Sequence, residues 1–169
     1  RRICVVLPFT NIIDQSVEFY WNALVEEAKD PEAVVAAHHY RAEYQDPSSR
    51  HLAFNWENPV VVVTAVQFFE TLASKNSGSL RKLHHLPGSA IFIDEAHAVL
   101  PVPLWSQAWK WLKILNEQWG YYTVLGSGSL NRFWELKDFA DSPEQLLELL
   151  EQEIFKELQD QKEKRVSYK

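Results

Sequence analysis

The stretch that decides the fold is AIFIDEAHA, residues 90 to 98. It opens with four apolar residues, as expected of a strand covered on both faces of a parallel sheet. Polarity then switches abruptly at Asp94. Ligands in open α/β sheets bind at the carboxyl ends of strands, so Asp94, Glu95 and His97 stand where the chemistry of such folds is usually found.

Two adjacent carboxylates at a strand end suit the metal ion of a bound nucleotide. We expect Asp94 to hold Mg²⁺, directly or through water, and Glu95 to polarise the water that attacks the γ-phosphate of ATP. His97 would then transmit changes at the nucleotide site to neighbouring residues. The alternative is a strand that ends in a solvated acidic turn, and these residues alone leave both interpretations open.

Composition narrows the class of protein. The chain has 169 residues, 46% of them apolar, which is enough for one domain with a sizeable core. A single Cys4 forms no internal disulfide, and no apolar run approaches the length that spans a membrane, so we expect a cytoplasmic setting. The net charge of -6 argues against a general electrostatic grip on nucleic acid. The sequence contains no methionine, which we interpret as a sign of an internal or processed piece.

Strand-like and helical runs alternate along the chain, which is typical of a parallel sheet with crossover helices. The expected strands are residues 3–7, 33–40, 60–63, 90–93 and 121–125. We expect a first helix capped by Thr10 or Asn11, two short helices over residues 66–73 and 80–86, and a long helix after Leu104 that ends at Gly120. Loops are expected over residues 43–58 and 75–79. In the helix after Leu104, a stripe of apolar residues that includes Trp105 and Trp119 predicts the buried face.

The end of the chain differs from the rest. Ser142 and Pro143 predict the start of a last helix, and its charges change from acidic to basic along its length. Residues 165–169 alternate like a further strand. We therefore divide residues 1–169 into a motif-bearing part, 1–140, and a charged helix with a strand-like tail, 141–169.

Small polar groups follow the strands in a fixed order. They are Thr10 after Pro8, then Thr64, then Asp94 to His97, then Ser127 and Ser129. This ordered set resembles the first RecA-like lobe of superfamily 2 helicases. The resemblance implies an α/β fold with helices on both faces of a parallel sheet, threonine contacts to the backbone of a single strand, and a serine turn that couples hydrolysis to movement.

A closer resemblance covers most of residues 1–140. The segments LPFTNIIDQS, NPVVVVTAVQFFETL, SGSLRKLHHLPGSAIFIDEAHAVLPVPLW and LGSGSLNRFWEL look like the helicase part of the CRISPR-associated helicase-nuclease of type I systems. It implies a DEAH-box ATP hydrolase that acts on single-stranded DNA in antiviral defence, together with a CRISPR surveillance complex and the remainder of the helicase chain.

The roles carried over from the resemblance fall on a few residues. Thr10 and Thr64 become candidate nucleic-acid contacts, Asp94 and Glu95 the metal and water residues, and His97 with Ser127 and Ser129 the coupling set. Apart from the resemblance, the basic residues Arg81, Lys82 and Arg132 are either contacts to a phosphate backbone or solvated surface charges. Two departures from the wider superfamily stand out: the box ends in His97 where many motors have aspartate, and the serine turn is Ser-Gly-Ser where many have Ser-Ala-Thr.

The sequence lacks one motif that such a motor needs. A phosphate-binding loop reads G-x-x-x-x-G-K-[ST], and none of the five glycines precedes a lysine. The resemblance implies that the loop and its strand lie upstream of Arg1, beside the strand that ends in the serine turn. We therefore expect an incomplete sheet and an isolated chain that does not hydrolyse ATP.

Other interpretations compete with this one. A lobe that binds or serves as a scaffold without turnover is one, and a superfamily 2 motor that acts on RNA or duplex DNA is another. The pairs His38-His39 and His84-His85 suggest zinc, but their spacing matches no zinc motif. A nucleophilic Ser127 or Ser129 lacks the G-x-S-x-G pattern. Among the tryptophans, Trp111 and Trp134 are the better candidates for exposed rings that stack on bases, and a place in the core is the favoured interpretation for both.

Overall fold

The computed structural model describes residues 1–24, 30–38, 53–128, 132–136, 146–149 and 154. It divides into two compact units, Arg1–Phe133 and Trp134–Lys169, and the first unit contains every strand of the described sheet. Most of the predicted last helix from Ser142, and all of the strand-like tail at residues 165–169, lie outside the described residues. Within that span residues 146–149 have no regular structure and Ile154 is helical.

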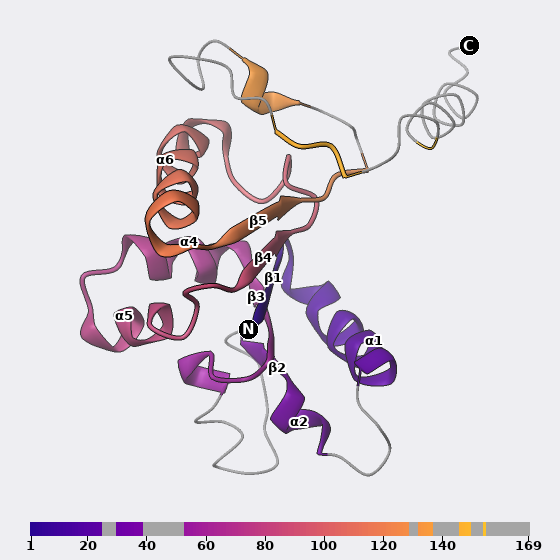
Figure 1. Cartoon of the computed structure of the whole chain (residues 1–169). Helices are drawn as coiled ribbons and strands as arrows, with labels where there is room; N and C mark the ends of the chain where they lie inside the picture. Colours follow the sequence, from indigo (N-terminus) through magenta and orange to yellow (C-terminus); the bar gives the residue numbers. More distant parts are fainter. Residues whose placement is uncertain (25–29, 39–52, 129–131, 137–145, 150–153, 155–169) are drawn as a thin grey trace. The chain divides into compact units, whose positions relative to one another are not determined.

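The first unit is an α/β domain with a five-stranded, all-parallel sheet in the order β2-β3-β1-β4-β5 (Figure 1). This confirms the predicted α/β class and the parallel sheet. The strands are β1 (Ile3–Leu7), β2 (Val35–His38), β3 (Val60–Thr64), β4 (Ala90–Ile93) and β5 (Tyr122–Leu125).

Helices lie on both faces of the sheet (Figure 1). Helix α1 packs on β2 and β3, α4 packs on β3 and β1, and α6 contacts β5. The helical elements are η1 (Thr10–Ile12), α1 (Ile13–Leu24), α2 (Pro31–Val34), α4 (Ala65–Ala73), α5 (Ser77–Leu83), α6 (Val102–Trp119) and η2 (Phe133–Glu135). No helix among the described residues is long and apolar enough to cross a membrane.

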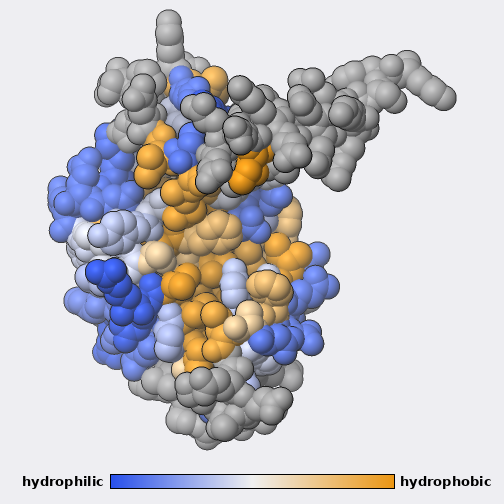
Figure 2. Space-filling view, turned by 45° about the vertical axis from the view of Figure 1, so that its right-hand side comes forward, coloured by the Kyte–Doolittle hydropathy of each residue, from blue (hydrophilic) through white to orange (hydrophobic). Residues whose placement is uncertain are grey.

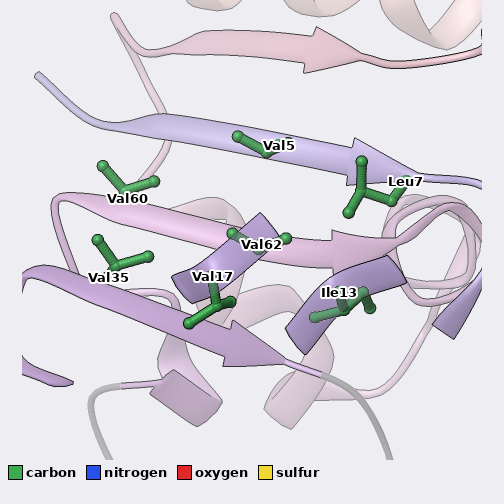
Figure 3. Close-up of a cluster of buried hydrophobic side chains, with 7 residues drawn as sticks. All are labelled: Val5, Leu7, Ile13, Val17, Val35, Val60 and Val62. Carbon is green, nitrogen blue, oxygen red and sulfur yellow. The ribbon is translucent and has the colours of Figure 1, made fainter. Parts of the chain in front are cut away.

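The core on the α1 side of the sheet is a cluster of buried aliphatic side chains (Figure 3). Its members are Val5, Leu7, Ile13, Val17, Val35, Val60 and Val62. Because successive side chains of a strand point to opposite faces, Val6, Val61 and Ile93 face the other side, where they are equally buried. Burial of each such side chain contributes about 1.5–3 kcal/mol, so the valine run of β3 stabilises both layers at once.

The predicted helix after Leu104 is confirmed as α6. It ends at Gly120, whose φ of 68° places it in the left-handed region that favours glycine. Trp105, Ala108, Trp109, Leu112 and Leu115 of the predicted stripe are buried. Trp119, the last member of the stripe and the last residue of α6, is 43% exposed.

Several predicted boundaries were wrong. Neither Thr10 nor Asn11 caps α1: the chain enters the helix through the 3-10 turn η1, which Phe9 precedes without a side-chain cap. The strand predicted at 33–40 begins only at Val35, because the end of α2 occupies the two residues before it. The loop predicted at 75–79 contains the start of α5, where Asn76 Oδ1 accepts the Gly78 N–H at 2.8 Å.

Residues 53–58, predicted as part of a loop, hold a tightly packed turn. Trp56 is completely buried with a left-handed φ of 61°, and its ring stacks on Phe68 of α4 at 6.1 Å. A bulky residue with positive φ is strained, so the burial of the indole must outweigh that strain. The local sequence predicted only a loop over these residues, and not the burial of Trp56.

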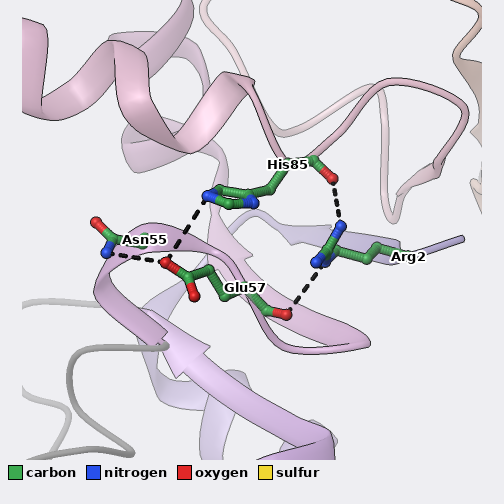
Figure 4. Close-up of polar contacts among 4 residues, drawn as sticks. All are labelled: Arg2, Asn55, Glu57 and His85. Atoms are coloured by element: carbon green, nitrogen blue, oxygen red, sulfur yellow. Dashed lines mark hydrogen bonds and ion pairs between the residues drawn. The ribbon is translucent and has the colours of Figure 1, made fainter.

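A polar network joins the turns at the amino edge of the sheet (Figure 4). The Arg2 guanidinium donates to the carbonyl oxygens of Glu57 at 3.1 Å and His85 at 3.0 Å. The Glu57 carboxylate accepts from the Asn55 amide at 3.1 Å and lies 3.7 Å from His85 Nε2. These contacts tie the residues before β1, β3 and β4 together, which leaves the opposite, carboxyl edge for the candidate site.

The sheet keeps an accessible apolar surface beside α1. On this side Ile3 is 44% exposed and Tyr122 is 64% exposed, while Phe92 and Val124 are half-buried. Figure 2 shows apolar side chains gathered in a band down one face of the molecule. Among the described residues β5 pairs with β4 alone, so its other side is an edge of the described sheet.

Candidate functional site

The acidic turn begins where β4 ends. The Asp94 N–H donates to the Val6 carbonyl at 3.0 Å, so the first residue of the turn is still held by β1. Asp94 Oδ1 in turn accepts the Glu95 N–H at 3.0 Å. Glu95 has a φ of 46°, the left-handed region that L residues other than asparagine and aspartate rarely adopt. The sheet therefore fixes Asp94, and a strained backbone turns the Glu95 side chain away from the strand direction.

The serine turn after β5 is bonded directly to the acidic turn. The Gly126 N–H donates to the Ile93 carbonyl at 2.8 Å, and the Gly126 carbonyl accepts the Ala96 N–H at 2.8 Å. A Cβ at Gly126 would lie 2.9 Å from the Phe92 ring and 3.3 Å from Asp94 Oδ1. Close approach of the two turns thus depends on this glycine.

Three of the residues that the sequence singled out meet across these turns. His97 Nδ1 lies 2.9 Å from Ser127 Oγ and 3.3 Å from Glu95 Oε2. The side chains of His97 and Glu95 are 33% and 44% exposed, so the group is open to solvent and to a ligand. A change in charge or position at the Glu95 carboxylate can pass through the imidazole to the serine turn. Ser129, the other predicted coupling residue, lies outside the described residues.

Sequence reasoning missed two residues at this site, Gly126 and Tyr20. The helical spacing of Tyr20 marked it only as part of an apolar face, and its ring does pack against the core cluster. Burial, and secondly the negative charge of Asp94, raise the pKa of the Tyr20 phenol. Tyr20 therefore lies within electrostatic reach of the acidic turn. A phenol hydroxyl on an otherwise apolar helix face was the available signal.

The predicted nucleic-acid residues occupy other strand ends. Leu7 and Thr64 are partners in the parallel register, so the residues that follow β1 and β3 lie on neighbouring strand ends. Thr64 Oγ1 accepts the Gln67 N–H at 3.1 Å and caps α4. Thr10 is half-buried at the start of η1, and Arg132 is exposed. The structure brings the segments of Thr10 and Thr64 to one edge of the sheet.

One histidine of each pair, His38 and His85, makes a contact elsewhere in the fold. His38 Nε2 lies 3.1 Å from Lys82 Nζ, and His85 contacts Glu57 at the amino edge. Lys82 is only 4% exposed between the rings of Phe54 and Trp56, and this burial lowers its pKa. No cluster of three or more potential metal ligands occurs among the described residues.

The two carboxylates of the acidic turn fit a magnesium ion that brings its other ligands with it. Mg²⁺ is commonly bound through one or two carboxylates plus substrate phosphates and water, rather than by a complete protein cage. Asp94 is fixed by the sheet, and Glu95 lies next to it with a partly exposed carboxylate. The donor set suits Mg²⁺ held together with a nucleotide.

Comparison with known proteins gives one informative similarity. No protein-family profile matches the chain. The fold and the site define an α/β parallel-sheet domain with an acidic turn at its carboxyl edge. Among curated proteins, the chain is similar to the CRISPR-associated nuclease/helicase Cas3 of Haloferax volcanii, with 24% identity over 135 residues. The alignment covers 70% of this chain and 14% of that protein, so the chain spans a small part of the relative's length.

Proposed function

We propose that this chain is part of an ATP-dependent nucleic-acid translocase of CRISPR defence, acting on single-stranded DNA. The observation that favours this most is the contact of His97 with both Ser127 and Glu95, because it joins the acidic turn to the serine turn. The similarity to a CRISPR-associated nuclease/helicase supports the same class of protein.

In this proposal the residues of the two turns divide the work. Asp94, held by β1, orients Mg²⁺ and the phosphates of ATP, and the metal supplies neutralisation of developing phosphate charge when bound. Glu95 orients the attacking water with its exposed carboxylate. His97 exchanges hydrogen bonds between Glu95 and Ser127, so loss of the γ-phosphate changes the position of the serine turn, and Ser129 belongs to the same coupling set.

Thr10, Thr64 and Arg132 contact the strand in this proposal. Hydroxyl and guanidinium groups bind phosphate oxygens without reading the bases, as a translocating protein requires. The surveillance complex of a CRISPR system and the remainder of the helicase chain would be its partners. The cell interior is where such a system acts.

The decisive experiment replaces Glu95 in the full-length polypeptide. Glu95→Gln keeps the size of the side chain and removes the base, so ATP hydrolysis should fall by about 10²- to 10⁴-fold while nucleotide binding persists. Glu117→Gln, an identical change at an exposed position of α6, is the matched control and should leave hydrolysis unchanged. An unaltered rate in Glu95→Gln would remove Glu95 from this role.

A competing function is a RecA-like module that binds or scaffolds without turnover. It is favoured by the lack of a phosphate-loop motif in these 169 residues. Residues 1–169 on their own should therefore hydrolyse no ATP above background. A full-length polypeptide that binds its partners normally but hydrolyses no ATP would support the scaffold instead.

A further inference from the structure

Two large apolar side chains are exposed in the segments that follow the neighbouring strands β1 and β3, Phe9 in the turn after β1 and Val66 in the first turn of α4. Phe9 is 59% exposed and Val66 is 58% exposed. Because Leu7 pairs with Thr64, Phe9 and Val66 each lie two residues beyond a matched pair in the parallel register. Pro8 and the 3-10 turn η1 flank Phe9, whose backbone is extended at φ −132° and ψ 145°. The ring is thus presented by a short, constrained turn.

Phe9 differs from the other exposed phenylalanines in having no aromatic neighbour. Phe19 makes an edge contact with Tyr20 at 5.6 Å, and Phe54 contacts His38 at 5.8 Å and Lys82 at 5.1 Å. Among the described residues Phe9 makes no ring or cation contact. Single exposed apolar side chains are ordinary, but here a second one, Val66, stands in the first turn of the helix that follows the adjacent strand.

Hydroxyl groups alternate with these apolar side chains. Thr10 follows Phe9 directly, and Thr64 precedes Val66 by two residues. Thr64 Oγ1 accepts the Gln67 N–H, so the hydroxyl keeps its own proton to donate to an anion. A single strand of nucleic acid alternates in the same way, with a charged phosphate and an apolar base in each unit. Aromatic rings bind such strands by stacking on any base.

We propose that Phe9 is a base-stacking residue, with Val66 packing against the edge of the same base, for a single strand whose phosphates contact Thr10 and Thr64. This inference rests on the proposed nucleic-acid function and adds to it a contact to the bases. Stacking needs no hydrogen bond to the base, so the contact is tolerant of sequence. The stacked ring holds one base in place between the two backbone contacts.

The test measures binding of the full-length polypeptide to a fluorescent oligothymidylate by anisotropy. Phe9→Ala should weaken binding by about tenfold, a typical loss for one stacked base. Phe9→Trp should restore it, because indole stacks at least as well. Phe19→Ala, which removes an even more exposed ring from α1, is the matched control and should have no effect.

A strand with abasic sites separates stacking from other effects. Phe9→Ala and the wild type should bind the abasic strand equally, whereas Thr64→Ala should weaken binding to both strands. An equal loss on the abasic strand would overturn the stacking role. Unchanged binding of Phe9→Ala with weakened binding of Thr64→Ala would refute this inference and leave the proposed function intact. Failure of the wild type to bind any single strand would refute both.

Discussion

Gly126 offers the sharpest test of how the two turns fit together. Its backbone does not require glycine, because its φ lies outside the left-handed region, so alanine is tested here for space alone. A Cβ at this position would lie 2.9 Å from Phe92 Cζ, 3.1 Å from Phe92 Cε2 and 3.3 Å from Asp94 Oδ1. The Gly126 N–H and carbonyl are both bonded to the acidic turn at 2.8 Å, so the backbone cannot retreat without breaking one of them.

The expected cost follows from these contacts. Forcing a methyl group into a packed site typically costs about 1–3 kcal/mol. The Phe92 ring is half-buried and faces the accessible side of the sheet, so it can move aside to make room for the added methyl group. We therefore expect the lower half of that range for Gly126→Ala, about 1–2 kcal/mol of unfolding free energy. In a chain of this size that lowers the melting temperature by roughly 2–8 °C.

Denaturation by urea and by heat measures this cost. Gly128→Ala is the matched control, since its Cβ would meet only Glu95 Oε1 at an ordinary 3.5 Å, and it should cost under about 0.5 kcal/mol. In a Phe92→Leu background the shorter side chain leaves room, so Gly126→Ala should cost less than in the wild type. Equal stability of the Gly126 and Gly128 variants would refute the reasoning.

Two further predictions concern the sheet. Burial raises the pKa of Cys4 from 9.0 to about 12, so the folded state retains a proton that the unfolded chain loses. The contribution of Cys4 to the free energy of unfolding is present below pH 9 and should be lost as the pH rises toward 12. In alkaline denaturation, the stability of Cys4→Ala should therefore fall less steeply with pH than that of the wild type. Parallel falls in the two proteins would contradict this. At the β5 edge, the Tyr122 and Gly126 amides donate to the carbonyls of Ser89 and Ile93, on the β4 side. By alternation the amides of Thr123 and Leu125 point outward, so they should exchange with deuterium much faster than that of Val62. Equal protection of all these amides would show that another segment pairs with this edge.

The strands were predictable because their signal is local. The valine run of β3 and the apolar AIFI of β4 are readable from residue type alone, and Gly120 marks the end of α6 because it supplies a positive φ. Boundaries were less accurate where tertiary contacts decide them. Residues 33 and 34 are apolar, yet Asp30 accepts the Glu32 N–H at 3.0 Å and starts α2 ahead of the strand.

The buried polar groups could not be predicted. Lys82 was interpreted as a solvated charge or a phosphate contact, but it is buried against His38, Phe54 and Trp56. Those partners come from segments far from Lys82 in sequence, and the pattern of a short basic helix carries no information about them. Trp111 is half-buried, as is Trp134 in the second unit, so neither ring is fully exposed.

The sequence by itself determined the class of fold and the edge where the polar residues gather. Hydrophobic periodicity and strand-end polarity are local properties, and parallel strands must present their carboxyl ends together. Only the tertiary structure decided which of those residues touch. His97 and Ser127 are 30 residues apart, and they meet because β4 and β5 are adjacent and Gly126 lets their turns approach. The left-handed backbone of Glu95 likewise arises from that packing, since no propensity of glutamate favours it.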